Sequence, residues 1–385
     1  MAARKLYYMD FKKLNFITQK FFIDSKVLSI KMVDSGLINK TYIVEHLYNG
    51  IKSKFILQSL SNIFVSHEIV NMNHKLITDH IKSKINKTFS DFDCKEWKVP
   101  SLIRCKSNNL FGFAFESDYW RAMLYIDQAL NFDSLEDEIM AYQTGIGLAR
   151  FHSLCSDFDS SKLENSINNF HDTRYYIDQY IKTIKDYNFN KLDNEVKKKI
   201  QELISSLDNH IVLVDFLLIS LSHESIDLNV IHGDPKLSNF LFDFQYKHVV
   251  SLIDLDTVSS GYLLTDLADC IRSICNVAGG NPKDNDDVCF DVASCKYFLK
   301  GYFSITKESK NYSFRFLPEF IYLIIFELTI RFLTDFLQSN RYFKIKYETH
   351  NLFRAEVQYR LLSSFLLQIP NLTNELKEIG ISSPT

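Results

Sequence analysis

Residues 231–239 read Ile-His-Gly-Asp-Pro-Lys-Leu-Ser-Asn, and the string Ile-Asp-Leu-Asp occupies residues 253–256. Within them, Asp234, Asn239 and Asp254 provide two carboxylates and one amide at fixed spacings. A carboxylate can orient and deprotonate a hydroxyl group, and carboxylate and amide oxygens are ligands that hard cations such as Mg²⁺ prefer. The two stretches therefore predict a site that binds a divalent cation beside an activated hydroxyl.

Each stretch includes or follows a short apolar run, Leu228–Ile231 or Val249–Ile253, that predicts a buried strand. The acids would then lie at strand ends, at the mouth of a cleft. The order His-x-Asp, then Asn five residues after the Asp, then a metal-binding Asp is typical of phosphoryl transfer. We predict that Asp234 is the base and that Asn239 and Asp254 bind magnesium. The alternative is that Asp234 caps a turn and Asp254 is a partnered strand-end acid.

Three neighbours of this set receive supporting roles. Lys236, two residues after Asp234, is placed to offset charge on a transferred phosphate, although a solvent-facing lysine in a turn is the alternative. His232 is expected to organise the loop through hydrogen bonds and not to act as a base. Asp256 is expected either to orient the metal ligands or to be a second metal ligand, and the sequence favours neither role.

The string His232-Gly233-Asp234 with Asn239 resembles the aminoglycoside phosphotransferase and choline kinase superfamily, whose fold is similar to that of protein kinases. Within that superfamily the chain is most similar to the N-acetylhexosamine 1-kinases. The similarity runs from about residue 30 to about residue 362, and the stretches that carry it are 36–42, 55–58, 253–257, 331–337, 342–343 and 351–352. One departure is Gly233, where many sugar kinases of this type are expected to have Asn.

The predicted nucleotide site lies in the first part of the chain. A loop over residues 35–41 joins two predicted strands, and its one glycine could bring backbone N–H groups near phosphates, although the loop alone fits a plain turn. The backbone near Tyr125–Asp127 is expected to bind adenine. The residues assigned to nucleotide binding are Ser35, Gly36, Asn39, Thr41, Gln58, Tyr125 and Asp127.

Gln58 stands where kinases usually carry the lysine that binds the α- and β-phosphates. Glutamine offers two N–H donors but no charge. The missing charge is expected from Lys54 or Lys40, and the alternative is that Gln58 is only a residue on the sheet surface. Glu68, the expected partner of the missing lysine, is left without a clear role.

The acceptor site is predicted in the C-terminal helices. Glu327, Arg331 and Asp335 recur every four residues and share one helical face, for which a salt-bridged surface stripe is the plain interpretation. The resemblance implies instead that Arg331 and Tyr342 line a hexose pocket. An aminoglycoside or choline site would require clustered acids or an aromatic cage for a cation.

Composition favours a soluble, helix-rich enzyme. The chain has 385 residues, a net charge of −3, 32 Phe and 20 Tyr but only 11 Gly and 6 Pro. This charge gives no basic field for nucleic acid or acidic membranes. Residues 1–10 contain no apolar core of the kind a signal peptide has, and the apolar run 320–326 is too short to span a bilayer. Seven Cys without a CxxC pair suggest reduced thiols. We therefore expect a cytoplasmic protein with no nucleic-acid or membrane partner.

The order of predicted elements gives an α+β, protein-kinase-like bilobal fold, with a small antiparallel-sheet N-lobe and a large, mostly helical C-lobe. The N-lobe, residues 1–127, is expected to bind the nucleotide. It contains strands at 27–32, 41–47 and 54–60, a helix over 67–83, and strands at 110–115 and 120–126, with a hairpin turn at Asn49-Gly50. The C-lobe, residues 128–385, contains helices over 136–154, 161–226 and 265–367 around the catalytic segment, and a loop at 279–287.

Together these features predict an ATP- and Mg²⁺-dependent kinase of a small-molecule sugar, with the anomeric hydroxyl of an N-acetylhexosamine or related hexose as the favoured acceptor. An aminoglycoside or choline/ethanolamine kinase is one alternative. A nucleotide-binding pseudokinase with a regulatory role is another, favoured by the missing lysine but opposed by the complete set of Asp234, Asn239 and Asp254.

Overall fold

The computed structural model describes residues 2–33, 36–87, 97–245, 247–279, 282, 287–306 and 312–381. The chain divides into two compact units. The first contains Met1–Ala129 and Ser166–Asn168, and the second contains Leu130–Asn165 and Asn169–Thr385. The predicted boundary after residue 127 lies two residues before this division. Ser35 and most of the predicted loop at 279–287 lie outside the described residues.

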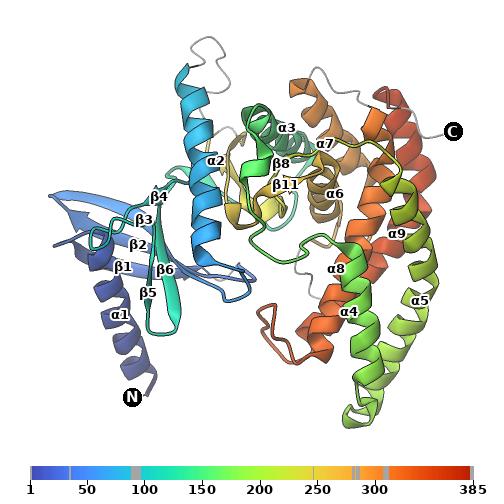
Figure 1. Ribbon diagram of the computed structural model, residues 1–385, viewed down its shortest axis with the longest axis horizontal. Coiled ribbons are helices and arrows are strands. Elements are labelled where there is room, and N and C mark those ends of the chain that lie inside the picture. The colour runs from blue at the N-terminus through green and yellow to red at the C-terminus, as the bar shows by residue number, and fades with distance from the viewer. Residues whose placement is uncertain are drawn as a thin grey trace. The chain divides into compact units, whose positions relative to one another are not determined.

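The first unit is built on an antiparallel sheet of six strands (Figure 1). The main order is β1-β2-β3-β6-β4, and β5 pairs with β6. The strands are β1 Lys26–Val33, β2 Lys40–Tyr48, β3 Ile51–Leu60, β4 Leu102–Ile103, β5 Phe113–Phe115 and β6 Asp118–Leu124. Asn49 and Gly50 both have positive φ between β2 and β3, as a type I′ hairpin turn requires, so the predicted hairpin is confirmed.

Two helices accompany this sheet. Helix α1, Ala2–Phe21, packs Leu14, Ile17 and Phe21 into the same core as Phe55 and Leu57 of β3. The sequence interpretation did not include α1. Helix α2, His67–Lys87, matches the predicted helix, and the hydroxyl of Ser66 caps it by accepting from the backbone N–H groups of Glu68 and Ile69.

The second unit is mainly helical. Its helices are α3 Glu138–Cys155, α4 Thr173–Asp186, α5 Asn194–Ser222, α6 Leu263–Ile274, α7 Val292–Ile305, α8 Leu317–Leu337 and α9 His350–Glu378. Helices α8 and α9 lie side by side (Figure 1), and almost the whole of α8 is buried. A Cβ on Gly145 of α3 or on Gly301 of α7 would overlap backbone atoms of the other helix. The two glycines thus permit the close packing of α3 against α7.

Short strands carry the segments of chemical interest. Strand β8, Asn229–Ile231, pairs with β11, Ser259–Gly261, in antiparallel register. Strand β9, Phe240–Asp243, pairs with β10, Val249–Leu252. Three-residue 3₁₀ turns follow the two predicted loops, at Leu237–Asn239 and Leu255–Thr257. The two apolar runs predicted as strands are therefore strands, and the polar residues follow their ends.

Among the described residues, one helix, α5, is long and apolar enough to cross a membrane by length and composition. Val212, Phe216 and Ile219 in its second half are exposed. The region 161–226, predicted as helical, contains α4 and α5, and the second half of α5 is apolar, with exposed side chains. Length and composition alone are weak support for a membrane span, because soluble proteins contain helices that meet both criteria.

Candidate active site

The loop after β8 depends on a glycine. Gly233 has φ of 84°, in the left-handed region that favours glycine. A Cβ at this position would also lie 2.7 Å from the carbonyl oxygen of Thr257. An asparagine tolerates left-handed φ but would meet this close contact. The local structure therefore explains why residue 233 is glycine here and not the asparagine expected in many sugar kinases. The hydroxyl of Thr257 donates to the carbonyl of His232 at 2.9 Å, which joins the two loops.

Asp234 and Asn239 are joined within the loop. The side-chain N–H of Asn239 donates to the backbone carbonyl of Asp234 at 2.8 Å, which leaves the amide oxygen as the group suited to a cation. Lys236 Nζ lies 2.5 Å from Asp234 Oδ2. Burial opposes the charge of Lys236, but Asp234 and Asp254 outweigh it and raise the pKa of the lysine. Lys236 is therefore a charged neighbour of the predicted base and not a solvent-facing turn residue.

Asp254 follows β10 with an unusual backbone. Its φ of 68° and ψ of 53° are left-handed, a strained conformation for a residue that is not glycine. Its segment is tied to the catalytic loop, because the N–H of Ile253 donates to the carbonyl of Asn239 at 2.9 Å. Strain of this kind is common at functional positions and fits the predicted metal-binding role. Asp256, two residues on, is buried.

His232 connects the two loops. Its Nε2 lies 2.9 Å from the carbonyl of Ile253, and its Nδ1 lies 3.2 Å from the backbone N–H of Asp234. Burial lowers the pKa of His232, which favours the neutral ring. A neutral ring protonated at Nε2 would donate to the carbonyl and accept from the N–H, so both contacts are satisfied. His232 thus contributes hydrogen bonds that organise the loop.

Asp266 of α6 anchors the same loop, which the sequence interpretation missed. Its carboxylate accepts from the N–H of His232 at 2.6 Å and from the N–H of Gly233 at 2.8 Å. His152 of α3 contacts the same carboxylate at 2.9 Å. Burial alone would raise the pKa of Asp266, but these partners lower it. Within α6, Asp269 pairs with Arg272 at 2.7 Å, whereas Asp266 bonds to the loop and to His152.

The predicted acceptor residues lie in a buried cluster. Arg331 donates to Glu327 at 3.2 Å and to the hydroxyl of Tyr342 at 3.3 Å. Its guanidinium also lies over the rings of Phe170, Tyr176, Tyr342 and Phe343. Glu327, Arg331 and Asp335 are at most 8% exposed, so the interpretation of a salt-bridged surface stripe is wrong.

Asp335, unlike Arg331, bonds mainly to the backbone of a neighbouring segment. Its carboxylate accepts from the backbone N–H groups of Tyr342 and Phe343 at 2.8 and 3.0 Å, and from the side chain of Asn351 at 2.8 Å. These bonds fix the segment that carries Tyr342 against α8. The stretches that carried the resemblance, 331–337, 342–343 and 351–352, therefore meet in one place.

His171 links this cluster to the catalytic loop. Its Nε2 lies 2.7 Å from the carbonyl of Gly233, and its Nδ1 lies 3.4 Å from Glu327. Burial would lower the pKa of His171, but Glu327 and the carbonyl of Gly233 together raise it. Glu327 also accepts from the hydroxyl of Thr173 at 2.9 Å. No sequence pattern singled out His171, which is an isolated histidine in an irregular segment.

In the first unit, a buried arginine lies beside Gln58. Arg121 of β6 pairs in register with Gln58 of β3 and donates to its side-chain oxygen at 2.7 and 3.0 Å. The side-chain N–H of Gln58 in turn donates to the hydroxyl of Thr41 at 3.0 Å. Gln58 is 8% exposed, so the interpretation of a sheet-surface residue is wrong. A cation does stand near the expected lysine position, but it comes from the adjacent strand.

The other predicted nucleotide residues lie around this strand pair. The side chain of Asn39 accepts from the N–H of Ser61 at 3.0 Å. Lys54 Nζ lies over the ring of Tyr125 at 5.3 Å, and the carbonyl of Asp127 accepts from Lys98 at 2.9 Å. The carboxylate of Glu68 accepts from the hydroxyl of Ser66 at 2.8 Å, at the start of α2.

A model of the phosphotransferase enzyme family matches residues 97–286, which include the catalytic loop and Asp254. These residues belong to that phosphotransferase family. The predicted resemblance to the aminoglycoside phosphotransferase and choline kinase superfamily is therefore confirmed, and so is the prediction that the chain is a phosphotransferase enzyme.

Solved structures confirm the predicted fold class. A spectinomycin phosphotransferase, in complex with ADP and spectinomycin, has a TM-score of 0.55 at 12% identity over 92% of this chain and 97% of that one. A microcompartment-associated aminopropanol kinase gives 0.56 at 12% identity over 93% and 98%. The ethanolamine kinase of Plasmodium vivax gives 0.55 at 14% identity over 89% and 84%. At these identities the likeness shows the protein-kinase-like fold.

The donor set of this phosphotransferase fits magnesium better than a metal held by protein ligands alone. Among the described residues, no group of three or more His, Cys, Asp or Glu side chains is arranged to bind a metal. Magnesium at nucleotide sites typically takes one or two carboxylates, with water and phosphate oxygens completing its shell. One carboxylate from Asp254 and one amide oxygen from Asn239 match that requirement.

Proposed function

We propose that this phosphotransferase moves the γ-phosphoryl group of ATP to a hydroxyl of a small-molecule sugar, in a magnesium-dependent reaction. The favoured acceptor is the anomeric hydroxyl of an N-acetylhexosamine or related hexose. The observation that carries this proposal is the buried cluster around Arg331, together with its contact to the catalytic loop through His171. The protein is proposed to act in the cytoplasm.

In this mechanism Asp234 orients the acceptor hydroxyl and removes its proton as the phosphoryl group arrives. Asn239 and Asp254 would bind magnesium, which supplies charge neutralisation at the nucleotide phosphates. Lys236 carries a positive charge beside Asp234, where it can stabilise negative charge on the transferred group. Asp256 and His232 would keep these groups in place, His232 through its two hydrogen bonds to the loops.

The first unit is proposed to bind the nucleotide. Gly36, Asn39 and Thr41, with the undescribed Ser35, would cover the phosphates. Gln58 would donate to a phosphate oxygen, and the charge of Arg121 behind it would strengthen that bond. The backbone around Tyr125 and Asp127 would contact adenine. The ADP bound by the structurally similar spectinomycin phosphotransferase supports ATP as the co-substrate.

The chemistry around Arg331 favours a neutral acceptor over a cation. A choline-type site needs an aromatic cage for a positive charge. Here four aromatic rings already surround a guanidinium, and the nearest carboxylate, Glu327, pairs with Arg331 and His171. A second cation would meet the charge of Arg331. Sugar hydroxyls or an N-acetyl carbonyl would instead accept hydrogen bonds from it.

An aminoglycoside, choline or ethanolamine kinase is the second candidate function, because structurally similar proteins are named as kinases of such acceptors. ADP release from Mg²⁺-ATP, measured with N-acetylhexosamines, hexoses, ethanolamine, choline and spectinomycin, separates the two. We expect turnover with a sugar, and none in the matched Asp234→Asn protein. Turnover with the cations alone would overturn the sugar assignment, and stoichiometric nucleotide binding without turnover on any acceptor would favour a pseudokinase.

A further inference from the structure

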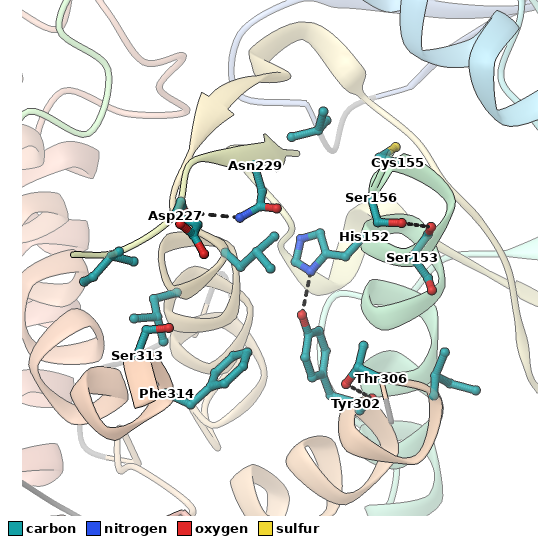
Figure 2. A pocket seen from close by; sticks show the side chains of 15 residues that line it. His152, Ser153, Cys155, Ser156, Asp227, Asn229, Tyr302, Thr306, Ser313 and Phe314 are labelled. Atoms are coloured by element: carbon teal, nitrogen blue, oxygen red, sulfur yellow. Dashed lines mark hydrogen bonds between the residues drawn. The ribbon is translucent and has the colours of Figure 1, made fainter. Parts of the chain in front are cut away.

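A cavity lies in the second unit, away from the residues proposed to carry out phosphoryl transfer. Its volume is about 460 Å³. Its walls come from the end of α3, residues 226–230, the start of α6, the end of α7 and the turn before α8. Figure 2 shows His152 between Ser153 and Ser156 on one side and Asp227 and Asn229 on the other. Cavities of 300–1,000 Å³ are typical of small-molecule sites.

The cavity is distinct from the catalytic loop. In the β8–β11 ribbon, Ile231 pairs with Ser259 at the end from which the catalytic loop departs. Asn229 pairs with Gly261 at the opposite end, and Asn229 and Leu263 both line the cavity. The residues that line it do not overlap with those assigned to phosphoryl transfer.

The lining specifies the class of ligand. Its polar side chains are mostly neutral donors and acceptors: Ser153, Ser156, Asn229, Tyr302, Thr306 and Ser313. The described lining contains one acid, Asp227, and neither Lys nor Arg. An anion would find no positive charge here, whereas hydroxyl groups would find partners and an amine could pair with Asp227. Apolar side chains such as Val230, Leu264 and Phe314 supply the remaining walls.

Two wall residues lead to the catalytic loop. The hydroxyl of Tyr302 lies 2.9 Å from His152 Nδ1, and His152 Nε2 lies 2.9 Å from Asp266 (Figure 2 shows the first bond). Asp266 in turn accepts from the N–H groups of His232 and Gly233. His152 is 5% exposed, and Asp266 is fully buried. A molecule that contacts His152 is therefore two hydrogen bonds from the backbone next to Asp234, and one that contacts Tyr302 is three.

We propose that this cavity is a regulatory site for a small polyhydroxylated molecule, neutral or carrying one amine, and that its occupancy is transmitted to the catalytic loop through Tyr302, His152 and Asp266. Binding itself does not depend on the proposed sugar kinase activity. The effect on the catalytic loop can also be measured without a substrate. The two parts of the inference can therefore be tested even if the acceptor is not a sugar.

Binding is tested by calorimetry with three matched probes: myo-inositol, an inosamine in which one hydroxyl is an amine, and myo-inositol 1-phosphate. We expect saturable binding of the first two and at least tenfold weaker binding of the phosphate. Ser156→Trp should fill the cavity and weaken binding at least tenfold, whereas Ser205→Trp on exposed α5 should not. Asp227→Ala should weaken the inosamine and spare myo-inositol.

Arg331→Ala distinguishes this cavity from the proposed acceptor site. Probe binding that survives Arg331→Ala and is lost in Ser156→Trp supports the inference. The reverse pattern would place the probes in the acceptor site and would overturn the inference. The inference would also be overturned if neither myo-inositol nor the inosamine bound saturably. Each variant is first compared with the wild type in thermal unfolding, and Thr306→Trp replaces Ser156→Trp if that protein does not fold.

Coupling is tested by hydrogen–deuterium exchange of the peptide over residues 231–239. Saturating myo-inositol should slow exchange of this peptide at least twofold in the wild type. Tyr302→Phe keeps the ring but removes the hydroxyl that contacts His152. It should still bind the probe and lose the change in exchange. Equal protection in Tyr302→Phe and wild type, or no protection in either, would overturn the proposed coupling.

Discussion

Two histidine–carboxylate pairs contact the catalytic loop, and they do so in opposite order. In the pair from α3 and α6, the carboxylate of Asp266 touches the loop and His152 lies behind it. In the other, the imidazole of His171 touches the loop and Glu327 lies behind it. The first pair accepts from loop N–H groups, whereas the second donates to a loop carbonyl. Asp266 therefore fixes the loop from inside the fold, and His171 connects it to the acceptor cluster.

This difference predicts that mutations in the two pairs have different consequences. Loss of Asp266 leaves two buried N–H groups and His152 without their acceptor, which is an effect on folding. Loss of His171 removes a contact between the loop and the Glu327–Arg331 pair, which is an effect on the acceptor side. The following experiments break or sharpen this comparison.

The largest effect is expected for Asp266→Ala. This variant leaves the N–H groups of His232 and Gly233 without an acceptor, and each buried donor left unsatisfied costs about 1–3 kcal/mol. His171→Ala, which removes a single charge-assisted bond to a carbonyl, should lower the free energy of unfolding by about 1–3 kcal/mol. Urea unfolding at constant pH measures both. Asp269→Ala, one turn along α6, is the comparison: it removes the ion pair of a buried carboxylate with Arg272 but no acceptor of the loop N–H groups, so it should be milder than Asp266→Ala. Equal losses for all three variants would contradict the anchoring role of Asp266.

Asp234→Asn should show its effect in turnover and not in folding. General bases contribute about 10²–10⁴-fold, so kcat should fall about a hundredfold or more with ATP binding nearly unchanged. Asp254→Ala should instead weaken magnesium-dependent nucleotide binding. Turnover is followed by ADP release and nucleotide affinity by calorimetry with and without Mg²⁺. Near-wild-type turnover in Asp234→Asn would show that both histidine pairs support a loop with a different catalytic group.

The loop itself could be predicted from sequence because its geometry is local. Asp234 and Asn239 lie five residues apart, and Asp254 follows on the next strand but one. Short apolar runs before each loop were sufficient to place the acids at strand ends. The roles of these residues stay predictions, whereas the strands that position them are observed.

The anchors could not be predicted in the same way. Asp266 and His171 reach the loop only through tertiary packing, and a single acid or histidine in sequence carries no sign of its partner. Arg121 lies 63 residues from Gln58, and only the strand pairing brings the two together. Helix α1 had a usable signal, since Leu14, Ile17 and Phe21 recur at helical spacing, but its many polar residues obscured it.

Arg331→Ala tests the function of the second pair. A charged donor to a bound polar group contributes roughly 1.5–3 kcal/mol, so the KM for the sugar should rise about ten- to hundredfold while the KM for ATP stays constant. Tyr342→Phe should raise the same parameter by less, because only one hydroxyl is lost. Steady-state kinetics with each substrate varied in turn measures both. An unchanged sugar KM in a folded Arg331→Ala protein would remove the sugar-pocket assignment and favour the cationic acceptors.

The pH dependence of stability should have opposite signs for His171 and for His350, a histidine at the start of α9 that belongs to neither pair. The pKa of His171 is raised, so its charged form stabilises the fold below about pH 6.5, and this contribution is lost as the pH rises through the folded pKa. The difference between wild type and His171→Gln, about 1.5 kcal/mol at low pH for a charged hydrogen bond, should therefore shrink between pH 6 and 9 by urea unfolding. Burial lowers the pKa of His350 to about 4, so His350→Gln should instead gain relative stability as the pH falls from 6.5 towards 4. Parallel pH profiles for the two variants would contradict the charged state of His171.

The smallest effect is expected in the first unit, which is proposed to bind the nucleotide. There the side-chain amide of Gln58, and not a carboxylate, accepts the hydrogen bonds of the buried Arg121. Gln58 accepts from Arg121 and donates to Thr41, so it can offer a phosphate only a neutral N–H. Gln58→Ala should lose a hydrogen bond of about 1 kcal/mol, which corresponds to about a fivefold rise in the KM for ATP.

Lys40→Ala and Lys54→Ala are the matched controls, since the exposed Lys40 and the Lys54 that lies over Tyr125 were the sequence-based candidates for the missing charge. If either lysine variant raises the ATP KM more than Gln58→Ala, the charge comes from that lysine and not from Arg121. If Gln58→Ala has the larger effect, and Gln58→Glu restores no affinity because it neutralises Arg121, then the buried arginine acts on the nucleotide through the amide.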